Sequence, residues 1–179
     1  MKRLIVGITT LGILSTVSSA TNYNIDQTEE SFWHSPSDIR CLALNIYHES
    51  RNESLAGQVA VADVTMNRVY DTRYPSSICG VVQQAVLSEW HLERDRVVPV
   101  RHKCQFSWYC DGKSDEPNEG DSWERSKLIA QNFLTYGEYR GITEGATHYH
   151  ASYVSPDWIH DRGMDMVGSI GEHIFYRWN

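Results

Sequence analysis

The sequence contains little glycine and proline, with 12 and 5 of these residues among 179. Hydrophobic residues make up 41% and charged residues 22% of the chain. This composition excludes collagen-like, low-complexity and wholly disordered proteins. The sequence shows no internal repeat, and its length suits one domain of ordinary size.

Basic residues are also scarce. The 16 Lys and Arg are outnumbered by 23 Asp and Glu, which gives a formal net charge of -7. Proteins that bind nucleic acids electrostatically neutralise the phosphates with an excess of Lys and Arg. We therefore expect no nucleic-acid partner, and an anionic polymer would need a local basic site.

Long apolar stretches are absent after the first twenty residues. Lys2 and Arg3 precede an apolar, charge-free stretch from Leu4 to about Val17, and small residues follow up to Ala20. This order is typical of a secretory signal peptide cleaved after Ala20. Because the stretch is shorter than the roughly 20 residues that span a bilayer, we expect no permanent membrane span, with a retained anchor as the alternative. The predicted location is periplasmic or extracellular.

The four cysteines lack the close Cys-x2-4-Cys spacing that zinc knuckles use. They are Cys41, Cys79, Cys104 and Cys110, and all follow the predicted leader. An even number of cysteines in an exported chain predicts disulfides. Three pairings are possible, and the sequence does not choose among them.

The order of predicted elements is helices first and a small sheet last. After the leader (1–20) and a polar lead-in (21–34), Ser35 and Pro36 mark the start of an amphipathic helix over 35–49. The other expected elements are a largely buried helix (55–69), a short helix (78–87), an irregular charged stretch (88–103), a helix opened by a capping box at 121–124 and stopped by Gly137, and an antiparallel pair from 147–154 and 170–178. The fold class is α+β, in one domain over 35–179.

Glu49 is the first candidate for chemistry. It lies at the predicted C-terminal end of an apolar helix, ahead of the polar turn 50–54. A partly desolvated carboxyl group near the negative end of a helix dipole has its pKa raised, as a general acid at neutral pH requires. The structural alternative is a solvated glutamate that ends a surface helix.

Several segments together resemble the SleB-type cell wall hydrolases, the catalytic domains of spore-cortex-lytic enzymes and their Gram-negative and phage relatives. The resemblance covers roughly Ile39 to Trp178. The segments that carry it are 47–53, Gly57-Gln58-Val59-Ala60-Val61-Ala62, Asn67-Arg68-Val69, Tyr74-Pro75, 79–82, 104–108 and Ala146-Thr147-His148-Tyr149. The chain departs from the family pattern at Asn52 and Ser54, which puts the geometry of that turn in question.

The resemblance implies a mainly helical domain, similar to lysozymes and lytic transglycosylases, that cleaves peptidoglycan between N-acetylmuramic acid and N-acetylglucosamine. It places the catalytic acid at Glu49. A lytic transglycosylase needs only this carboxyl group and yields 1,6-anhydro products, whereas a hydrolytic path needs a second carboxylate. Glu53 and Asp111 are the candidates for the second group. The mechanism requires no cofactor, and we expect a monomer that acts as an endolysin or as a periplasmic remodelling enzyme.

The predicted substrate contacts combine amides, a hydroxyl, an indole and the residues of a late strand. Each also has a structural alternative, either capping of local backbone groups or burial in the core. On the strand, alternation places His148 and His150 on one face, where either residue can orient the acid or bind a glycan hydroxyl. The predicted contacts are Gln58, Asn67, Gln105, Ser107, Trp108, His148 and Tyr149.

Two other functions remain open at this point. His148 and His150, with His160 and His173 nearby in sequence, can supply a zinc site for an N-acetylmuramoyl-L-alanine amidase, although no HExxH pattern occurs. Alternatively, the six Trp and ten Tyr can form a non-catalytic wall-binding surface or a virion module. Replacement of Glu49 separates an enzyme from a pure binding protein.

Overall fold

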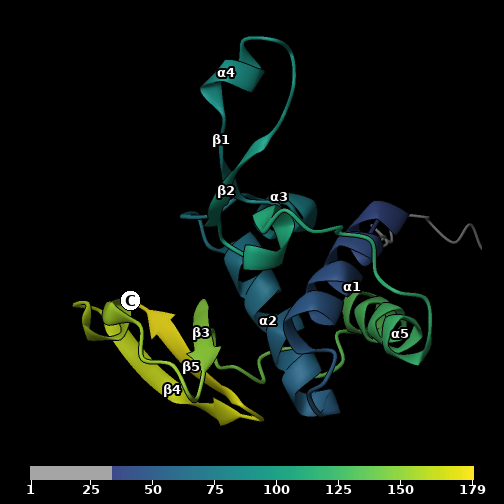
Figure 1. Ribbon diagram of the computed structural model, residues 1–179. Coiled ribbons are helices and arrows are strands. Elements are labelled where there is room, and N and C mark those ends of the chain that lie inside the picture. The colour runs from purple at the N-terminus through teal and green to yellow at the C-terminus, as the bar shows by residue number, and fades with distance from the viewer. Residues whose placement is uncertain (1–33) are drawn as a thin grey trace, which may run out of the picture. The chain divides into compact units, whose positions relative to one another are not determined.

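A computed structural model describes residues 34–179 (Figure 1). The predicted leader and nearly all of the lead-in lie outside these residues. The elements are α1 (Pro36–Ser50), α2 (Leu55–Tyr70), α3 (Ile78–Val82), β1 (Ala85–Leu87), α4 (Glu89–Leu92), β2 (Pro99–Cys104), η1 (Ser107–Cys110), α5 (Asp121–Tyr136), β3 (His148–Ala151), η2 (Asp157–His160), β4 (Met164–Ile170) and β5 (His173–Trp178). The predicted α+β fold is confirmed.

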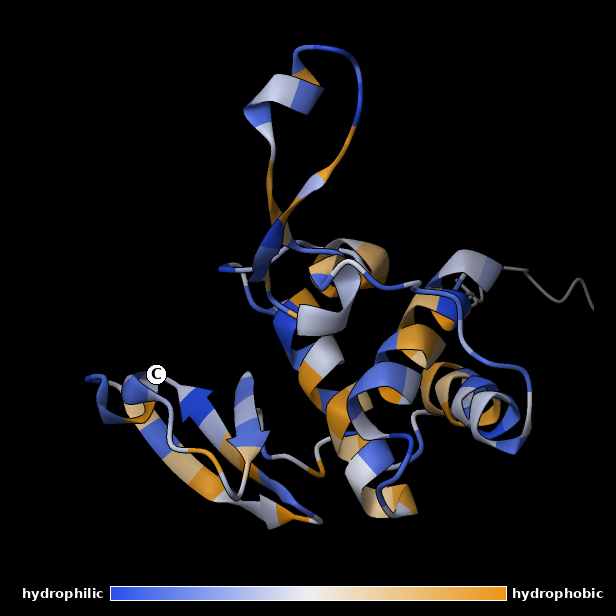
Figure 2. Cartoon of the chain, in the orientation of Figure 1, coloured by the Kyte–Doolittle hydropathy of each residue, from blue (hydrophilic) through white to orange (hydrophobic). Residues whose placement is uncertain are grey.

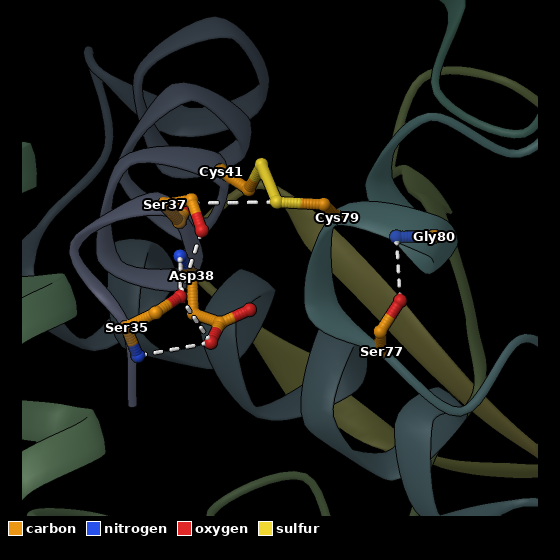
Figure 3. The surroundings of a disulfide bond; sticks show 7 residues. All are labelled: Ser35, Ser37, Asp38, Cys41, Ser77, Cys79 and Gly80. Atoms are coloured by element: carbon orange, nitrogen blue, oxygen red, sulfur yellow. Dashed lines mark hydrogen bonds between the residues drawn. A yellow bond between two sulfur atoms is a disulfide. The ribbon is translucent and has the colours of Figure 1, made fainter. Parts of the chain in front are cut away.

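Helix α1 begins as the sequence predicts. The Ser35 side chain accepts a hydrogen bond from the Asp38 N–H, and the Asp38 carboxylate accepts one from the Ser35 N–H (Figure 3). This reciprocal pair satisfies two N–H groups that the first helical turn would otherwise leave free. One turn later, Cys41 forms a disulfide with Cys79 of α3. The disulfide fastens the start of α1 to the short helix.

The main core lies among α1, α2, α3 and α5. Helix α2 is buried along most of its length, from Gly57 to Met66, which confirms the prediction of a helix covered on most sides. Its wide apolar surface packs against Leu42 and Ile46 of α1, and Phe133 of α5 belongs to the same cluster. Figure 2 shows hydrophobic residues along these helices.

Helix α5 starts differently from the prediction. Its N-cap is Gly120, and no side chain caps the helix, so the capping box predicted at 121–124 is wrong. The Ser122 carbonyl instead accepts a hydrogen bond from the buried Ser126 hydroxyl. The end of the helix is as predicted, because Gly137 adopts the left-handed conformation with φ 66° and its N–H donates to Phe133 O.

Residues 85–104 form an arm that the sequence analysis missed. The helix predicted over 78–87 ends at Val82, and β1 follows it. The stretch predicted to be irregular contains α4 and β2, and β2 pairs antiparallel with β1. Short strands interrupted by a bulge carry little periodic signal, which explains the error. In Figure 1 this arm extends away from the helices.

The C-terminal sheet has three strands in the order β3-β5-β4. The predicted pair, β3 and β5, is confirmed with the register Tyr149 to Phe175, and β4 is an additional strand on the other side of β5. The sheet packs on α2 through Phe175, which contacts a buried cluster with Ala60 and Val64. Small residues on α2 allow this close approach.

Buried polar groups of α2 hold the segment that leads into the sheet. The Asp63 carboxylate accepts hydrogen bonds from the N–H groups of Gly141 (2.9 Å) and Thr143 (3.0 Å). The Asn67 amide donates to Thr143 Oγ1 and Ala146 O. These contacts fix where β3 begins. Among residues 34–179, no helix is both long enough and apolar enough to cross a membrane.

Candidate active site

A carboxyl group lies where helix α1 ends. Glu49 is the second-last residue of α1, and the neighbouring Ile46 and Tyr47 are buried in the core. The Glu49 side chain therefore leaves the helix at the edge of the core and is partly buried. Its predicted position at the end of an apolar helix is confirmed, and it is not the fully solvated residue of the alternative interpretation.

The turn between α1 and α2 is held from inside. The Gln58 amide is buried and donates hydrogen bonds to Glu53 O (3.0 Å) and Arg51 O (3.4 Å). Ser54 caps α2 by accepting a hydrogen bond from the Gly57 N–H. The turn is therefore well formed although it carries Asn52 and Ser54.

Tyr149 reaches the carboxyl group from the sheet. Its hydroxyl donates a hydrogen bond to Glu49 Oε2 at 3.0 Å, and its ring packs against His173 and Phe175 of β5. Alternate residues of a strand point to opposite faces. Tyr149 lies on the face of β3 that turns toward α1. The sheet thus fixes one oxygen of the Glu49 carboxyl group.

Burial raises the pKa of Glu49, since the charged form loses its hydration. The hydrogen bond from Tyr149 and the positive charge of Arg68 oppose this effect, but burial is the largest of the three causes. Burial also raises the pKa of Tyr149 well above its usual value, so the phenol stays a hydrogen-bond donor. Glu49 therefore keeps its proton to higher pH than an ordinary glutamate.

Arg68 is a buried residue of this site that the sequence analysis did not single out. Its Nε donates to Thr147 O at 2.7 Å, and its guanidinium lies over the rings of Tyr74 and Phe106. A signal was available, because Arg68 is a charged residue within a helix predicted to be largely buried, and it lies inside one of the segments that carry the family resemblance. Arg68 joins α2 to the start of β3.

Two pockets meet at Glu49. Both are lined by His48, Glu49 and Arg51. The larger pocket, of about 510 Å³, also includes Tyr47, Ser107, Trp108 and Asp111 in its lining. The smaller, of about 210 Å³, extends to Glu53, Tyr153, Glu172 and His173. Because they share these lining residues, we call the two neighbouring pockets together the Glu49 cleft.

Trp108 forms one wall of the Glu49 cleft. Its ring stacks on His48 with a centroid distance of 4.5 Å, and its Nε1 donates to Asn45 Oδ1. Ser107 lies beside it and is exposed. Of the predicted substrate contacts, Ser107, Trp108 and Tyr149 therefore lie at the site, although Tyr149 binds the carboxyl group directly.

Three other predicted contacts do not line the Glu49 cleft. Gln58 binds the backbone of the turn and Asn67 binds the segment before β3, so their amides are engaged inside the protein. Hydrogen bonds from the amide nitrogens to nearby backbone groups were the alternative left open, although Gln58 Oε1 is buried without a hydrogen-bond partner. Gln105 is exposed and lines a separate pocket at the base of the arm.

The two strand histidines also lie elsewhere. His148 and His150 share one face of β3, as predicted, but that face packs on Trp158, away from Tyr149. They do not orient the acid, because the other face of the strand points to α1. His173 instead lines the smaller pocket. Among the described residues, no three His, Cys, Asp or Glu side chains come together in a group that could hold a metal ion.

The fold and the site define an α+β domain with an acid-bearing cleft, and comparisons with known proteins agree with this class. The cell wall hydrolase family matches residues 52–176. The spore cortex-lytic enzyme of Bacillus subtilis is 46% identical over 142 residues, which cover 79% of this chain and 38% of the relative. That of Halalkalibacterium halodurans is 41% identical over 144 residues, covering 79% and 35%.

Two solved structures are similar as well. The catalytic domain of the Bacillus cereus SleB protein matches with a TM-score of 0.50 and 26% identity, over 81% of this chain and 93% of that one. The catalytic domain of the germination-specific lytic transglycosylase SleB from Bacillus anthracis gives the same TM-score and identity, over 80% and 97%. The chain belongs to the SleB-type cell wall hydrolase family. It spans less than two fifths of the length of the two curated relatives named above.

Proposed function

We propose that this protein cleaves the glycan strands of peptidoglycan between N-acetylmuramic acid and N-acetylglucosamine, as a lytic transglycosylase. The observation that carries the proposal is a carboxyl group with a raised pKa, held by Tyr149 where two pockets meet. A polymer lying through both pockets passes directly over this acid. Since the family match begins at Asn52, the role of Glu49 is argued from its geometry and chemistry.

The reaction needs one carboxyl group in two protonation states. Glu49 donates its proton to the glycosidic oxygen, and the bond from that oxygen to C1 of the muramic sugar breaks as positive charge develops on the ring. The 6-hydroxyl of the same sugar then attacks C1, and the Glu49 carboxylate accepts its proton. The product is a 1,6-anhydro sugar, no water is consumed, and the acid is regenerated.

The hydrolytic path has two candidates for a second carboxylate, one on each side of Glu49. Glu53 lies in the smaller pocket and accepts a hydrogen bond from the Glu172 N–H at 3.3 Å. Asp111 lies in the larger pocket, where hydrogen bonds and the charge of Lys113 lower its pKa. Both carboxylates are engaged by neighbouring groups, which favours the path that needs Glu49 alone.

The wall of the Glu49 cleft suits a sugar polymer. Ser107 supplies an exposed hydroxyl and Arg51 a cation beside the acid, and the largely buried Trp108 presents an edge of its ring to the larger pocket. Aromatic faces with nearby hydrogen-bonding groups bind sugar rings. The names of the relatives, spore cortex-lytic enzyme and lytic transglycosylase, point to the same substrate class.

Export through the N-terminal leader is part of the proposal, and an exported protein that begins at Thr21 would support it.

Mass spectrometry of the soluble products from purified peptidoglycan tests this function. We expect muropeptides that end in anhydromuramic acid. Glu49→Gln should lower their formation by about 10² to 10⁴-fold, the usual contribution of a general acid. Glu124→Gln, an exposed glutamate on α5, is the matched control and should leave the rate unchanged.

Other products would overturn the proposal in distinct ways. Reducing muramic ends that disappear in Glu53→Gln or Asp111→Asn would show hydrolysis with a second carboxylate. Free stem peptides that are lost with EDTA would indicate the zinc amidase. Unchanged peptidoglycan that still binds the protein would indicate a wall-binding module.

A further inference from the structure

The smaller pocket of the Glu49 cleft carries two carboxylates that the proposed transglycosylase reaction does not use. Glu53 comes from the turn before α2, and Glu172 comes from the turn between β4 and β5. The volume of this pocket, about 210 Å³, is less than half that of the larger pocket, about 510 Å³. The smaller pocket therefore suits a single substituent of the substrate better than a run of sugar rings.

Glu53 is held in place by the backbone on two sides. Its Oε2 accepts a hydrogen bond from the Glu172 N–H at 3.3 Å. A Cβ placed on Gly57 would lie 2.9 Å from the Cβ of Glu53, and a Cβ placed on Gly171, where φ is +60°, would overlap Glu53 Oε2. Two glycines thus leave the room that this carboxyl group occupies. The hydrogen bond uses Oε2 and leaves Oε1 for a ligand.

His173 is a buried side chain of the same pocket that lacks a partner. It is only 8% exposed, and its Nδ1 is buried without a hydrogen-bond partner. Its ring packs on Tyr149, so it lies on the side of the sheet that faces Glu49. Buried polar side-chain atoms in proteins mostly have a partner, so the missing one points to a ligand. Because Nδ1 is covered, a ligand reaches this nitrogen only after the imidazole turns about its Cβ–Cγ bond.

The charges beside the smaller pocket favour a cation over an anion. The lining holds two carboxylates besides Glu49, against one guanidinium, that of Arg51. The guanidinium carbon of Arg51 lies 5.1 Å from the centre of the Tyr47 ring, and Tyr47 lines the larger pocket but not the smaller. The positive charge therefore lies toward the larger pocket, and the smaller pocket is left acidic.

His173 does not offset this acidity. Burial, the largest cause, lowers the pKa of His173, while the charges of Glu53 and Glu172 act in the opposite direction. The imidazole is therefore neutral at pH 7, and one of its nitrogens can accept a hydrogen bond. Within the described part of the chain, these three side chains do not form a group that could hold a metal ion. The ligand that fits the pocket is an organic cation with N–H donors.

We propose that the smaller pocket binds a primary ammonium group of the peptidoglycan substrate. An ammonium group has three N–H donors, and the pocket offers it the carboxylates of Glu53 and Glu172 and a ring nitrogen of His173. Peptidoglycan can carry such a group on the side chain of a diamino acid in the stem peptide, or on a glucosamine that lacks its acetyl group. The inference adds a substrate feature to the reaction proposed above and rests on that proposed function.

Binding of soluble peptidoglycan fragments to the full chain tests the inference. The protein carries Glu49→Gln, which should bind the fragments without cleaving them. Isothermal titration calorimetry compares fragments that have free amino groups with the same fragments after N-acetylation, which removes the positive charge. We expect the free amine to bind about fivefold more tightly, the effect of a partly exposed ion pair.

Peptide-free glycan separates the two sources of the ammonium group. Tighter binding of this glycan after N-deacetylation would assign the pocket to an amino sugar. If deacetylation changes nothing while the preference for free amines in the peptide-bearing fragments persists, the pocket binds the stem peptide. Either result supports an ammonium site.

Substitutions in the same background identify the groups that act. Glu172→Gln should remove most of the fivefold preference for the free amine, because the exposed carboxylate loses its charge while the backbone N–H still bonds to Glu53. N-acetylated fragments should bind this variant as before. His173→Phe keeps a ring against Tyr149 and should also weaken only the binding of the free amine. Glu124→Gln removes the same charge from α5, is the matched control, and should keep the full preference.

Three results would overturn the inference. Equal affinities for free and N-acetylated amines would show that no ammonium group is bound. Equal weakening of both forms in Glu172→Gln would show that this residue acts on the glycan in general. Binding of Ca²⁺ alone that is lost in Glu172→Gln would identify a metal site instead. If the amine preference is found but the wild type forms no anhydro product, the proposed reaction fails and the ammonium site stands.

Discussion

The two faces of strand β3 both carry titratable aromatic side chains, and these side chains have different surroundings. On one face, Tyr149 binds the Glu49 carboxyl group and packs on Phe175. On the other, His148 and His150 pack on Trp158, and His150 also stacks on Tyr176. One face therefore touches the candidate acid, while the other belongs to an aromatic cluster of the sheet.

Contacts with α2 determine which face of β3 turns toward Glu49. Phe175 shares the face of Tyr149 and packs against Ala60 and Val64, so this side of the sheet turns toward α2. Arg68 of α2 binds the backbone at Thr147, immediately before the strand. The comparison shows that a titratable residue gains influence on Glu49 from the face it occupies, and not from its residue type. Substitutions on the Tyr149 face should therefore change the reaction at Glu49, whereas substitutions on the His148 face should not.

Removing the Tyr149 hydroxyl should give the largest effect among these positions. Tyr149→Phe keeps the ring and deletes the hydrogen bond that fixes the Glu49 carboxyl group, so we expect kcat on peptidoglycan to fall about tenfold. The same bond favours the ionised carboxylate, so its loss raises the pKa of Glu49 further. The alkaline limb of the pH–rate profile should move to higher pH. A tenfold loss with an unshifted limb would contradict direct contact with the acid.

Arg68 should have a smaller effect in the same direction. Its charge favours ionised Glu49 less strongly than the Tyr149 hydrogen bond does. Arg68→Gln removes the charge and keeps a donor for Thr147 O, so the alkaline limb should again move to higher pH, by less than in Tyr149→Phe. Arg73→Gln is the control: this exposed arginine binds Asp71 and the Trp178 carbonyl and should leave the limb in place.

Much of the helical part could be predicted from sequence. Helices α1 and α2 have long apolar stripes and clear N-caps at Ser35 and Ser54, and Glu49 follows from where α1 ends. These signals are local, so they survive without knowledge of the fold. The prediction of disulfides rested on cysteine count and context, and the structure confirms it. The pairing Cys41–Cys79 and Cys104–Cys110 depends on distances that only the fold supplies.

The sheet and the arm could not be predicted in full, because their arrangement depends on tertiary contacts. Alternation correctly placed His148 and His150 together, yet the direction of each face is set by Ala60 and Val64, far away in sequence. Strand β4 was missed because it contains Gly168 and is interrupted by a bulge between Met166 and Gly168, which breaks the alternating pattern. The arm was missed because none of its residues is buried, so burial left no periodic pattern to read.

His148 provides the smallest expected effect on the reaction and a different effect on stability. Burial, followed by the charges of Arg68 and Arg73, lowers its pKa to about 4. The unfolded chain therefore takes up this proton first as the pH falls. The contribution of neutral His148 to folding is complete above about pH 6.5 and is lost as the pH falls through about 4.

His148→Gln should consequently flatten the fall in the free energy of unfolding between pH 6.5 and 4, as measured by urea unfolding at a series of pH values. Its pH–rate profile should keep the alkaline limb of the wild type, because the face of β3 that carries His148 does not contact Glu49. A shifted limb in this variant would show that the two faces are coupled through the strand. If His148→Gln keeps the wild-type limb while Tyr149→Phe and Arg68→Gln shift it, the pKa of Glu49 is controlled by the Tyr149 face of β3 and by α2.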